Sequence, residues 1–202
     1  KGFGSTNGVD DVRLTDRFQL GEPEFRGFDI RGVGPRVLRQ AYDTTTGEYI
    51  TQRDRLIGDD ALGGKAYYLG HAELEIPLGS GAKELGLRPS VFVDVGALFN
   101  VERPQTTTLT EDLKIYQQTY NGVTSQTTNA TAPDGTANIP LRTIPAFREL
   151  FLGDTAKPRV TVGIGVNWNS PFGPFRIDFA RAVTKQPGDD TKTFTFNVGT
   201  QF

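Results

Sequence analysis

Strict alternation of apolar and polar residues marks the second half of the chain. Between Arg159 and Asn169 every even position is apolar, and every odd position is polar or glycine. A period of two places all the apolar groups on one face of a β-strand. The pattern recurs elsewhere, less cleanly in the two earliest segments, and predicts five strands that pair antiparallel in sequential order. They are expected at about 65–77, 87–100, 158–169, 174–182 and 193–202.

The connections between these segments differ in length. Residues 77–86 and 170–174 are short and rich in glycine and proline, 183–192 is intermediate, and 5–62 and 101–157 are long, polar and rich in threonine. Outer-membrane barrels have short periplasmic turns and long external loops. Strands of a soluble β-sandwich alternate equally well, because periodicity does not tell lipid from a protein core. The loop asymmetry favours an all-β fold, an antiparallel up-and-down transmembrane β-barrel with long external loops.

Composition removes several classes of function. The chain of 202 residues has a net charge of -2, so it offers no basic surface for nucleic acid. It contains no cysteine, which excludes disulfides, thiolate zinc sites and cysteine nucleophiles. Its longest apolar runs fall far short of the ~20 residues of a membrane helix, so any membrane crossing has to use strands. Because the first residue is lysine, we expect the chain to be a C-terminal piece of a longer protein.

Five sequence segments, in order, resemble the C-terminal barrel region of the BamA family of outer-membrane β-barrel assembly proteins. They are "FRGF" at 25–28, "DDALGG" at 59–64, "RPSVFVDVGALF" at 88–99, "VGIGVNWNSPFGPFRIDFA" at 162–180 and "FTFNVGTQF" at 194–202. That family has a barrel of roughly sixteen strands preceded by POTRA domains. The resemblance implies that 1–202 is the C-terminal portion of such a barrel, with the POTRA domains absent. Residues 5–62 would be the sixth external loop, and 63–202 the last five strands with their loops.

The resemblance also implies a function. It predicts a non-enzymatic protein of the bacterial outer membrane, without cofactor or metal, that folds and inserts client β-barrel proteins through a lateral seam. Its other partners would be outer-membrane lipids and accessory assembly lipoproteins, and not nucleic acid. The alternatives are a TamA-like autotransporter-assembly barrel or a two-partner secretion pore, and, in another class, a passive porin or an outer-membrane hydrolase. The upstream sequence, channel conductance and hydrolysis assays would separate these functions.

One loop carries a candidate site in the stretch "EFRGFDIRGVGPR" at 24–36. In the BamA family the arginine of the corresponding motif folds into the barrel lumen and packs against acidic residues of the inner wall. The resemblance assigns this loop-to-lumen motif to Phe25, Arg26, Gly27 and Phe28, with an aromatic residue at its first position.

Glu73 and Asp94 are the expected partners of Arg26. Both lie at polar positions of their predicted strands, and both match the family's acidic partners. A guanidinium presents a planar fork of donors that suits carboxylates, and Gly27 would let the backbone approach the wall closely. Because a barrel lumen contains water, we expect this ion pair to be only partly desolvated.

Other charged residues have simpler interpretations. Arg31 and Arg36 are expected to be ordinary loop charges. His71, the single histidine, has no accompanying nucleophile motif and is interpreted as a residue that lines the lumen. The acidic doublets at 10–11, 59–60 and 189–190 lie in predicted loops without a repeating ligand spacing, so solvated turns are favoured over a calcium site.

The last strand carries a second family signal. Its alternating aromatic residues resemble the terminal β-signal by which outer-membrane barrels are recognised, although Thr200 replaces an apolar residue at one outward position. A lipid-facing strand with an interfacial aromatic residue would show the same pattern, and the two interpretations are compatible. In the BamA family this strand also forms the seam with the first strand. The β-signal and seam are assigned to Phe194, Phe196, Val198, Gly199 and Phe202.

Overall fold

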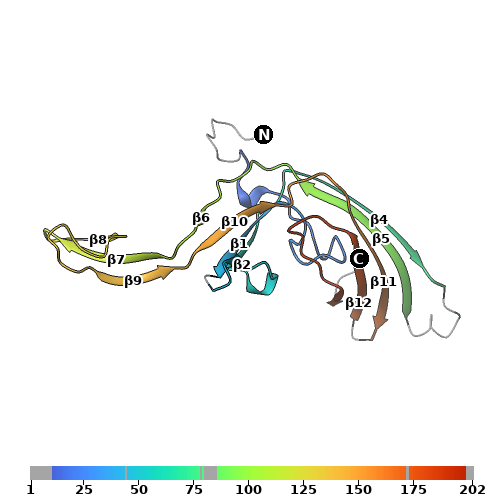
Figure 1. Ribbon diagram of the computed structural model, residues 1–202. Coiled ribbons are helices and arrows are strands. Elements are labelled where there is room, and N and C mark those ends of the chain that lie inside the picture. Colours follow the sequence, from blue (N-terminus) through green and yellow to red (C-terminus); the bar gives the residue numbers. More distant parts are fainter. Residues whose placement is uncertain (1–10, 44, 78, 80–85, 172, 199–202) are drawn as a thin grey trace. The chain divides into compact units, whose positions relative to one another are not determined.

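The computed structural model is all-β (Figure 1). It describes every residue except 1–10, 44, 78, 80–85, 172 and 199–202. Its strands are β1 (Arg36–Asp43), β2 (Glu48–Tyr49), β3 (Gly58–Ala61), β4 (Ala66–Glu75), β5 (Leu87–Phe99), β6 (Thr108–Leu109), β7 (Leu113–Tyr120), β8 (Val123–Thr127), β9 (Ile139–Ile144), β10 (Phe147–Leu152), β11 (Arg159–Ser170), β12 (Gly173–Thr184) and β13 (Phe194–Val198). Two short 3-10 helices, η1 (Leu14–Asp16) and η2 (Arg53–Arg55), complete it. Within the described residues, no helix has the length and apolar character needed to cross a membrane.

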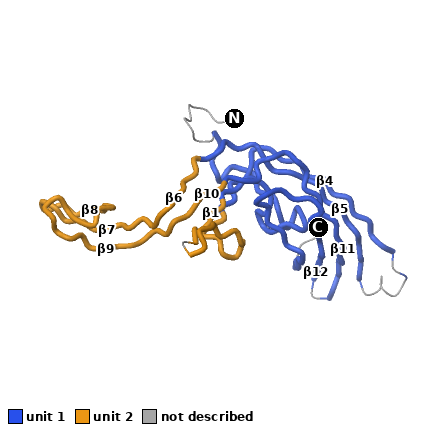
Figure 2. Tube along the Cα trace, viewed as in Figure 1, with its two compact units in different colours: residues 1–37, 60–104, 151–202 blue, residues 38–59, 105–150 orange. Residues whose placement is uncertain are grey.

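The chain divides into two compact units, each described by itself. The first comprises residues 1–37, 60–104 and 151–202, and the second comprises 38–59 and 105–150 (Figure 2). The first unit contains all five strands that the alternation pattern predicts.

These five strands form one antiparallel sheet. Its order is β13-β12-β11-β5-β4, so each strand pairs with its neighbour in the predicted series. The predicted bounds agree with the observed ones to within two residues, except at the last strand, whose final residues lie outside the described ones. The predicted sequential antiparallel order is confirmed. Among the described residues the five strands do not close into a barrel, because the sheet ends at β4 and β13.

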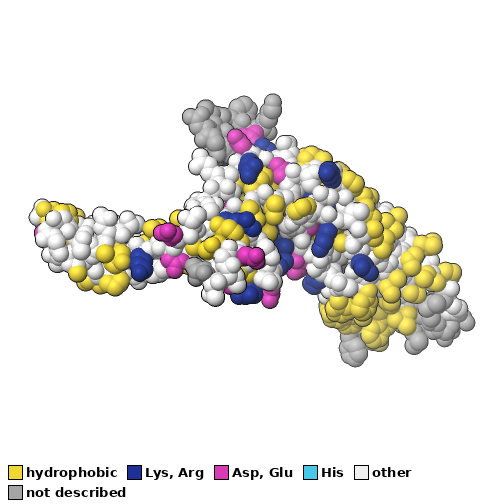
Figure 3. Space-filling view, in the orientation of Figure 1, with side chains coloured by type: hydrophobic (Ala, Val, Ile, Leu, Met, Phe, Trp, Pro, Cys, Tyr) yellow, Lys and Arg dark blue, Asp and Glu magenta, His cyan; other side chains and the backbone are white. Residues whose placement is uncertain are grey.

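The two faces of this sheet differ in the way that the alternation predicts. Apolar side chains of the outward face are exposed, and Figure 3 shows hydrophobic side chains gathered over these strands. Examples are Val93 of β5, Ile164 of β11 and Phe179 of β12, which are 44%, 59% and 50% exposed. Exposure of these side chains in the described residues agrees with a lipid-facing side of the sheet. The opposite face buries polar groups: Ser90, Asp94, Thr161, Arg176 and Asp178.

A small hydrophobic cluster lies against the inner face. It consists of Leu20, Phe25, Phe28, Val33 and Leu98, with Leu69 and Ala182 packed beside it. Four of its five buried members belong to the segment 18–33, and Leu98 is on β5. Two antiparallel bridges fasten this segment, from Phe18 to Gly64 and from Phe28 to Thr191. The inner face is therefore not uniformly polar, because the loop that covers it supplies an apolar core.

The second unit holds strands that the alternation pattern missed. We expected 5–62 and 101–157 to be loops, but eight strands lie there among the described residues. One sheet has the order β2-β1-β10-β6 with β3 on β1, and another has the order β8-β7-β9. In β1 the buried positions are Arg36, Leu38 and Gln40, so burial alternates while hydropathy does not. In β8 four of the five residues are exposed, so neither face needs apolar residues.

Candidate functional site

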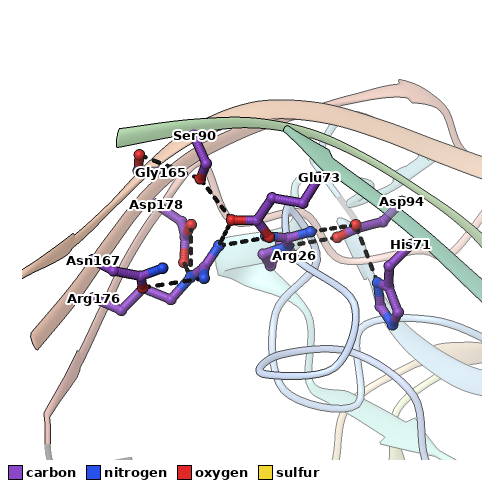
Figure 4. A network of polar contacts seen from close by, with 9 residues as sticks. All are labelled: Arg26, His71, Glu73, Ser90, Asp94, Gly165, Asn167, Arg176 and Asp178. Atoms are coloured by element: carbon purple, nitrogen blue, oxygen red, sulfur yellow. Dashed lines mark hydrogen bonds and ion pairs between the residues drawn. The ribbon is translucent and has the colours of Figure 1, made fainter. Parts of the chain in front are cut away.

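Arg26 lies with its guanidinium against two carboxylates of the sheet (Figure 4). Its Nε and Nη2 donate to the two oxygens of Asp94 on β5, at 2.8 and 2.6 Å. Its Nη1 donates to Oε2 of Glu73 on β4, at 2.7 Å. Two parallel hydrogen bonds to one carboxylate are the geometry in which a guanidinium binds most specifically. The structure thus brings Arg26 together with both acidic residues that the sequence analysis named.

The two carboxylates differ in their access to water. The Asp94 side chain has no exposed surface, whereas that of Glu73 is 27% exposed. The expectation of a partly desolvated pair therefore holds for Glu73 but is wrong for Asp94. The buried ring of Phe92 lies over Arg26, with the ring centroid 3.5 Å from the guanidinium carbon. A cation over an aromatic face is attracted to it, and the ring excludes water as well.

Phe92 was not predicted as part of the site. It is two residues before Asp94 and hence on the same face of β5. The available signal was an aromatic residue at a position that the alternation assigns to the polar face.

The aromatic residues of the motif hold the loop in place. Phe25 and Phe28 are fully buried, and their rings meet edge to face with centroids 4.7 Å apart. Gly27 between them has φ +86°, and a Cβ there would lie 2.9 Å from Cγ2 of Thr161. A side chain at this position would meet both an unfavourable backbone conformation and the wall of the sheet. The Phe-Arg-Gly-Phe sequence thus combines two apolar anchors with one residue that permits close approach.

The wall around Glu73 contains further polar partners that the sequence analysis did not name. Ser90 Oγ donates to Oε1 of Glu73 at 2.6 Å, and Arg176 Nη2 lies 3.1 Å from the same oxygen. Arg176 Nε donates to Asp178 Oδ2 at 2.8 Å. The signal was present, because Arg176 and Asp178 alternate with apolar residues on a predicted strand, but spacing alone did not show that they face Glu73.

His71 belongs to the same network of polar contacts. Its Nδ1 lies 3.1 Å from Asp94 Oδ1, and its side chain is 46% exposed. The Ser90 hydroxyl is directed at Glu73 rather than at this imidazole. His71 borders a polar cavity of about 450 Å³ together with Arg26, Glu73 and Arg176. This placement agrees with a histidine that lines the inner face.

The loop is also hydrogen-bonded to the connection between β12 and β13. The Asp29 amide donates to the Asp190 carbonyl at 3.0 Å, and the Asp190 amide donates to the Gly32 carbonyl at 2.8 Å. The Lys192 amide donates to the Gly27 carbonyl at 3.2 Å. These bonds continue the sheet pattern onto the loop, directly before the last strand begins.

An ion pair reinforces this connection. Lys192 Nζ donates to Glu22 Oε2 at 2.7 Å, and Asp29 lies 4.0 Å away. The hydrogen bond to Glu22 raises the pKa of Lys192. Because the Lys192 side chain is 40% exposed, this pair is worth at most about 1 kcal/mol.

Two simpler interpretations of charged residues need correction. Arg36 is not a solvated loop charge, because it is 3% exposed, begins β1 and donates to the carbonyl of Arg31. Asp189 is not in a solvated turn, because it forms a fully buried ion pair with Arg159 at 3.0 Å. Both assignments failed because a residue's position in a loop says nothing about which distant strand packs over it.

The last strand presents its apolar side chains outward. Phe194, Phe196 and Val198 are 47%, 51% and 59% exposed, and Thr195 between them is buried. β13 pairs with β12 from Phe179↔Phe194 to Phe175↔Val198. The other two residues assigned to the β-signal, Gly199 and Phe202, lie outside the described residues.

Comparisons with known proteins agree with this architecture. The Omp85 superfamily domain matches residues 1–202. An outer membrane protein assembly factor BamA from Neorickettsia risticii (strain Illinois) is 31% identical over 198 residues, which are 98% of this chain and 18% of that protein. The BamA of Neisseria meningitidis serogroup B (strain ATCC BAA-335 / MC58) is 26% identical over 179 residues, 88% of this chain and 17% of the relative.

A solved structure shows the same fold. The crystal structure of BamA from Haemophilus ducreyi lacking POTRA domains 1-3 matches 91% of this chain and 26% of that chain, with 22% identity and a TM-score of 0.50. The present chain spans less than a fifth of the length of the curated relatives that it matches.

Proposed function

Because the chain belongs to the Omp85 superfamily, we propose that it is the C-terminal barrel region of an outer-membrane protein assembly factor, which folds and inserts client β-barrel proteins. The match along the whole chain supports this proposal most directly, together with relatives that are named outer membrane protein assembly factors. The chain is part of a β-barrel of the bacterial outer membrane. The antiparallel sheet, apolar on its outward face and polar within, suits that location.

Clients would enter at a lateral seam formed by β13. In the described residues the sheet ends at this strand, which is paired with β12. The backbone groups of an unpaired strand edge form hydrogen bonds readily with an added strand. A seam that opens here would present such an edge to a client.

Residues 5–62 would be the sixth external loop of this barrel, and 63–202 its last five strands with their loops. The docked Arg26 supports this assignment, because the loop reaches the inner face of the sheet and is held there by two carboxylates. In this proposal Arg26 is a tether that keeps the loop inside the barrel while the seam opens to accept clients.

The remaining partners follow from the setting. The outward apolar face would contact outer-membrane lipids, and accessory assembly lipoproteins would bind the full-length protein. The proposed role is non-enzymatic.

A disulfide lock tests the proposed seam. The 202 residues contain no cysteine. With any cysteine elsewhere in the full-length protein replaced, one cysteine introduced into β13 and one into the first strand of the barrel form a defined pair. With the lock oxidised, we expect client insertion to stop while the barrel itself stays folded, as judged by heat-modifiable mobility on gels. Reduction should restore insertion, and each single cysteine variant serves as the control.

Two outcomes would contradict the proposal. Normal growth of cells with the lock fully oxidised would show that clients do not enter through the lateral seam. Steady single-channel conductance or hydrolytic activity, without client insertion by the wild-type protein, would favour a porin or a hydrolase instead.

A further inference from the structure

Glu73 accepts hydrogen bonds from two arginines that come from different parts of the chain (Figure 4). Arg26 approaches from the loop and contacts Oε2 at 2.7 Å. Arg176 approaches from β12, and its Nη2 lies 3.1 Å from Oε1 and 3.2 Å from Oε2. Arg26 can reach Glu73 only when the loop is docked, whereas Arg176 belongs to the wall.

Arg176 is itself held firmly by neighbours within the sheet. Its Nε donates to both oxygens of Asp178, at 2.8 and 3.1 Å, and its Nη1 donates to Asn167 Oδ1 at 3.2 Å. Its side chain is 8% exposed and that of Asp178 is 2% exposed. Arg176 and Asp178 are two residues apart on β12 and so share its inner face. The guanidinium of Arg176 is therefore fixed independently of the loop.

The charges along this face alternate in sign. The order is Asp94, Arg26, Glu73, Arg176, Asp178, and each member contacts the next. If Arg176 were absent, Arg26 and Ser90 would remain as the partners of Glu73 among the described residues. The Glu73 side chain is 27% exposed and could then turn toward water. The carboxylate would then have to be ordered each time the loop docks, which costs conformational entropy.

We propose that Arg176 is a positioning residue for the loop tether: it holds the Glu73 carboxylate in the orientation that receives Arg26. It thereby connects the docked loop to β12, the strand that pairs with β13. This inference rests on the proposed function in one respect, because the assembly role explains why the loop is tethered. The contact itself can be measured without any client protein.

Hydrogen exchange of the full-length protein in lipid nanodiscs tests the proposal. The Asp29 amide donates to the Asp190 carbonyl and the Lys192 amide donates to the Gly27 carbonyl, so exchange at these two positions reports whether the loop is docked. Arg176→Met should raise exchange at both amides by about tenfold, because a charge-assisted hydrogen bond supporting the docked state is lost. Amides at the β5–β11 pairing should keep their protection.

The matched control is Arg88→Met. Arg88 lies on the same face of the sheet, two residues before Ser90 and in register with Asn167, but it is exposed. Its replacement should leave the exchange of the loop unchanged. Arg176→Lys should rescue docking only in part, because an ammonium cannot contact Glu73 and Asp178 with a planar fork.

A second background separates positioning from general loss of structure. Arg176→Met leaves Asp178 without its cation, so the variant Arg176→Met with Asp178→Asn removes that charge as well. In a Glu73→Gln background, Arg176→Met should add little further exchange in the loop, because its effect passes through the Glu73 carboxylate.

The results that overturn the proposal are specific. The positioning role of Arg176 is wrong if the loop exchanges equally in the Arg176→Met and Arg88→Met proteins. It is also wrong if Arg176→Met has its full effect on loop exchange in the Glu73→Gln background. Failure of the wild-type protein to insert clients would instead overturn the assembly role, because the exchange measurement contains no client.

Discussion

At the scale of the residue, the tether is asymmetric. Arg26 shares two hydrogen bonds with a fully buried Asp94 and one with a partly exposed Glu73. Loss of the cation would leave the Asp94 carboxylate without its bidentate partner in a closed environment, which is the expensive situation for a charge. At Glu73 water and Arg176 can replace part of what is lost. The Asp94 contact should therefore account for most of the stability that Arg26 contributes.

Arg26→Ala should free the loop and lower client assembly while the barrel still forms. We expect the free energy of unfolding to fall by about 3 kcal/mol, the lower end of the range for breaking a buried pair. Arg26→Lys should restore only part of the stability, since an ammonium cannot reproduce the fork. Urea titration of the folded protein in lipid vesicles measures these differences.

A double-mutant cycle of Arg26→Ala and Asp94→Asn checks that the contact is direct. Residues in contact typically couple by about 0.5–3 kcal/mol. The double variant with reversed charges, Arg26→Glu with Asp94→Arg, should recover some of the assembly activity that each single change removes. A coupling near zero would show that the two residues stabilise the protein separately.

Gly27→Ala should be more harmful than the same change at another glycine with positive φ. Gly135 has φ +85° and nothing within 4 Å of its hypothetical Cβ, so Gly135→Ala should cost only the conformational penalty of about 1–2 kcal/mol. Gly27 has a similar φ of +86°, but a Cβ added there would also press against Thr161. This overpacking should add about 1–3 kcal/mol to the cost of Gly27→Ala. Equal losses in the two variants, measured by urea titration, would mean that close approach to the wall is unimportant.

At the scale of the element, the connection between β12 and β13 is held at both ends. Asp189 binds the fully buried Arg159 at the start of β11, while Asp190 and Lys192 bind the backbone of the loop. Arg159 also donates to the carbonyls of Gly153 and Thr155, each at 2.8 Å. A connection that would otherwise be a free external loop thus becomes a fixed entry to the last strand.

Arg159→Met should destabilise the protein strongly and loosen this connection. Removing one partner of a fully buried ion pair typically costs about 3–5 kcal/mol, because the other charge stays buried. Arg53→Met is the control, since the Arg53–Asp59 ion pair is about a third exposed and should contribute at most about 1 kcal/mol. Hydrogen exchange of residues 186–193 checks the local effect. Unchanged protection there in Arg159→Met would contradict it.

At the scale of the whole molecule, the sheet is built for two different environments. Its outward face exposes aliphatic and aromatic side chains, and its inward face carries buried ion pairs and the docked loop. Contiguous exposed apolar surface is rare on soluble monomers and marks contact with a membrane or another protein, which agrees with the outer-membrane location. The same strands therefore separate a membrane side from a lumen side.

The lipid-facing assignment predicts a depth-dependent cost of charge. Ile164 lies near the middle of β11, so Ile164→Lys in the full-length barrel should cost about 2–4 kcal/mol. Val183 lies at the end of β12 and is equally exposed, so Val183→Lys should cost only about 0–1 kcal/mol. Both are measured by urea titration in vesicles. Similar small costs at the two positions would indicate that this face meets water.

Local patterns of residues were sufficient to predict the five strands of the first unit, their order and their two faces. The alternation from Arg159 to Asn169, for example, predicts one strand and its apolar face. Successive side chains on a strand point to opposite faces, and a membrane-facing sheet needs apolar residues on one of those faces. The loop motif and its two carboxylates followed from resemblance to a family, with strand parity in agreement. The strands of the second unit were missed: β8 is almost wholly exposed, and β1 buries the polar residues Arg36 and Gln40 beside Leu38, so neither shows an apolar alternation.

Only the tertiary structure decided how buried each charge is and which residues share a carboxylate. The sequence alone determined that Glu73 and Asp94 face inward, but not that Asp94 is fully buried while Glu73 stays partly open. Nor did it determine that Arg176, 103 positions away from Glu73, reaches it across the sheet. The physical reason is that side-chain direction depends on local backbone geometry, whereas burial and pairing depend on the register of strands that are distant in sequence.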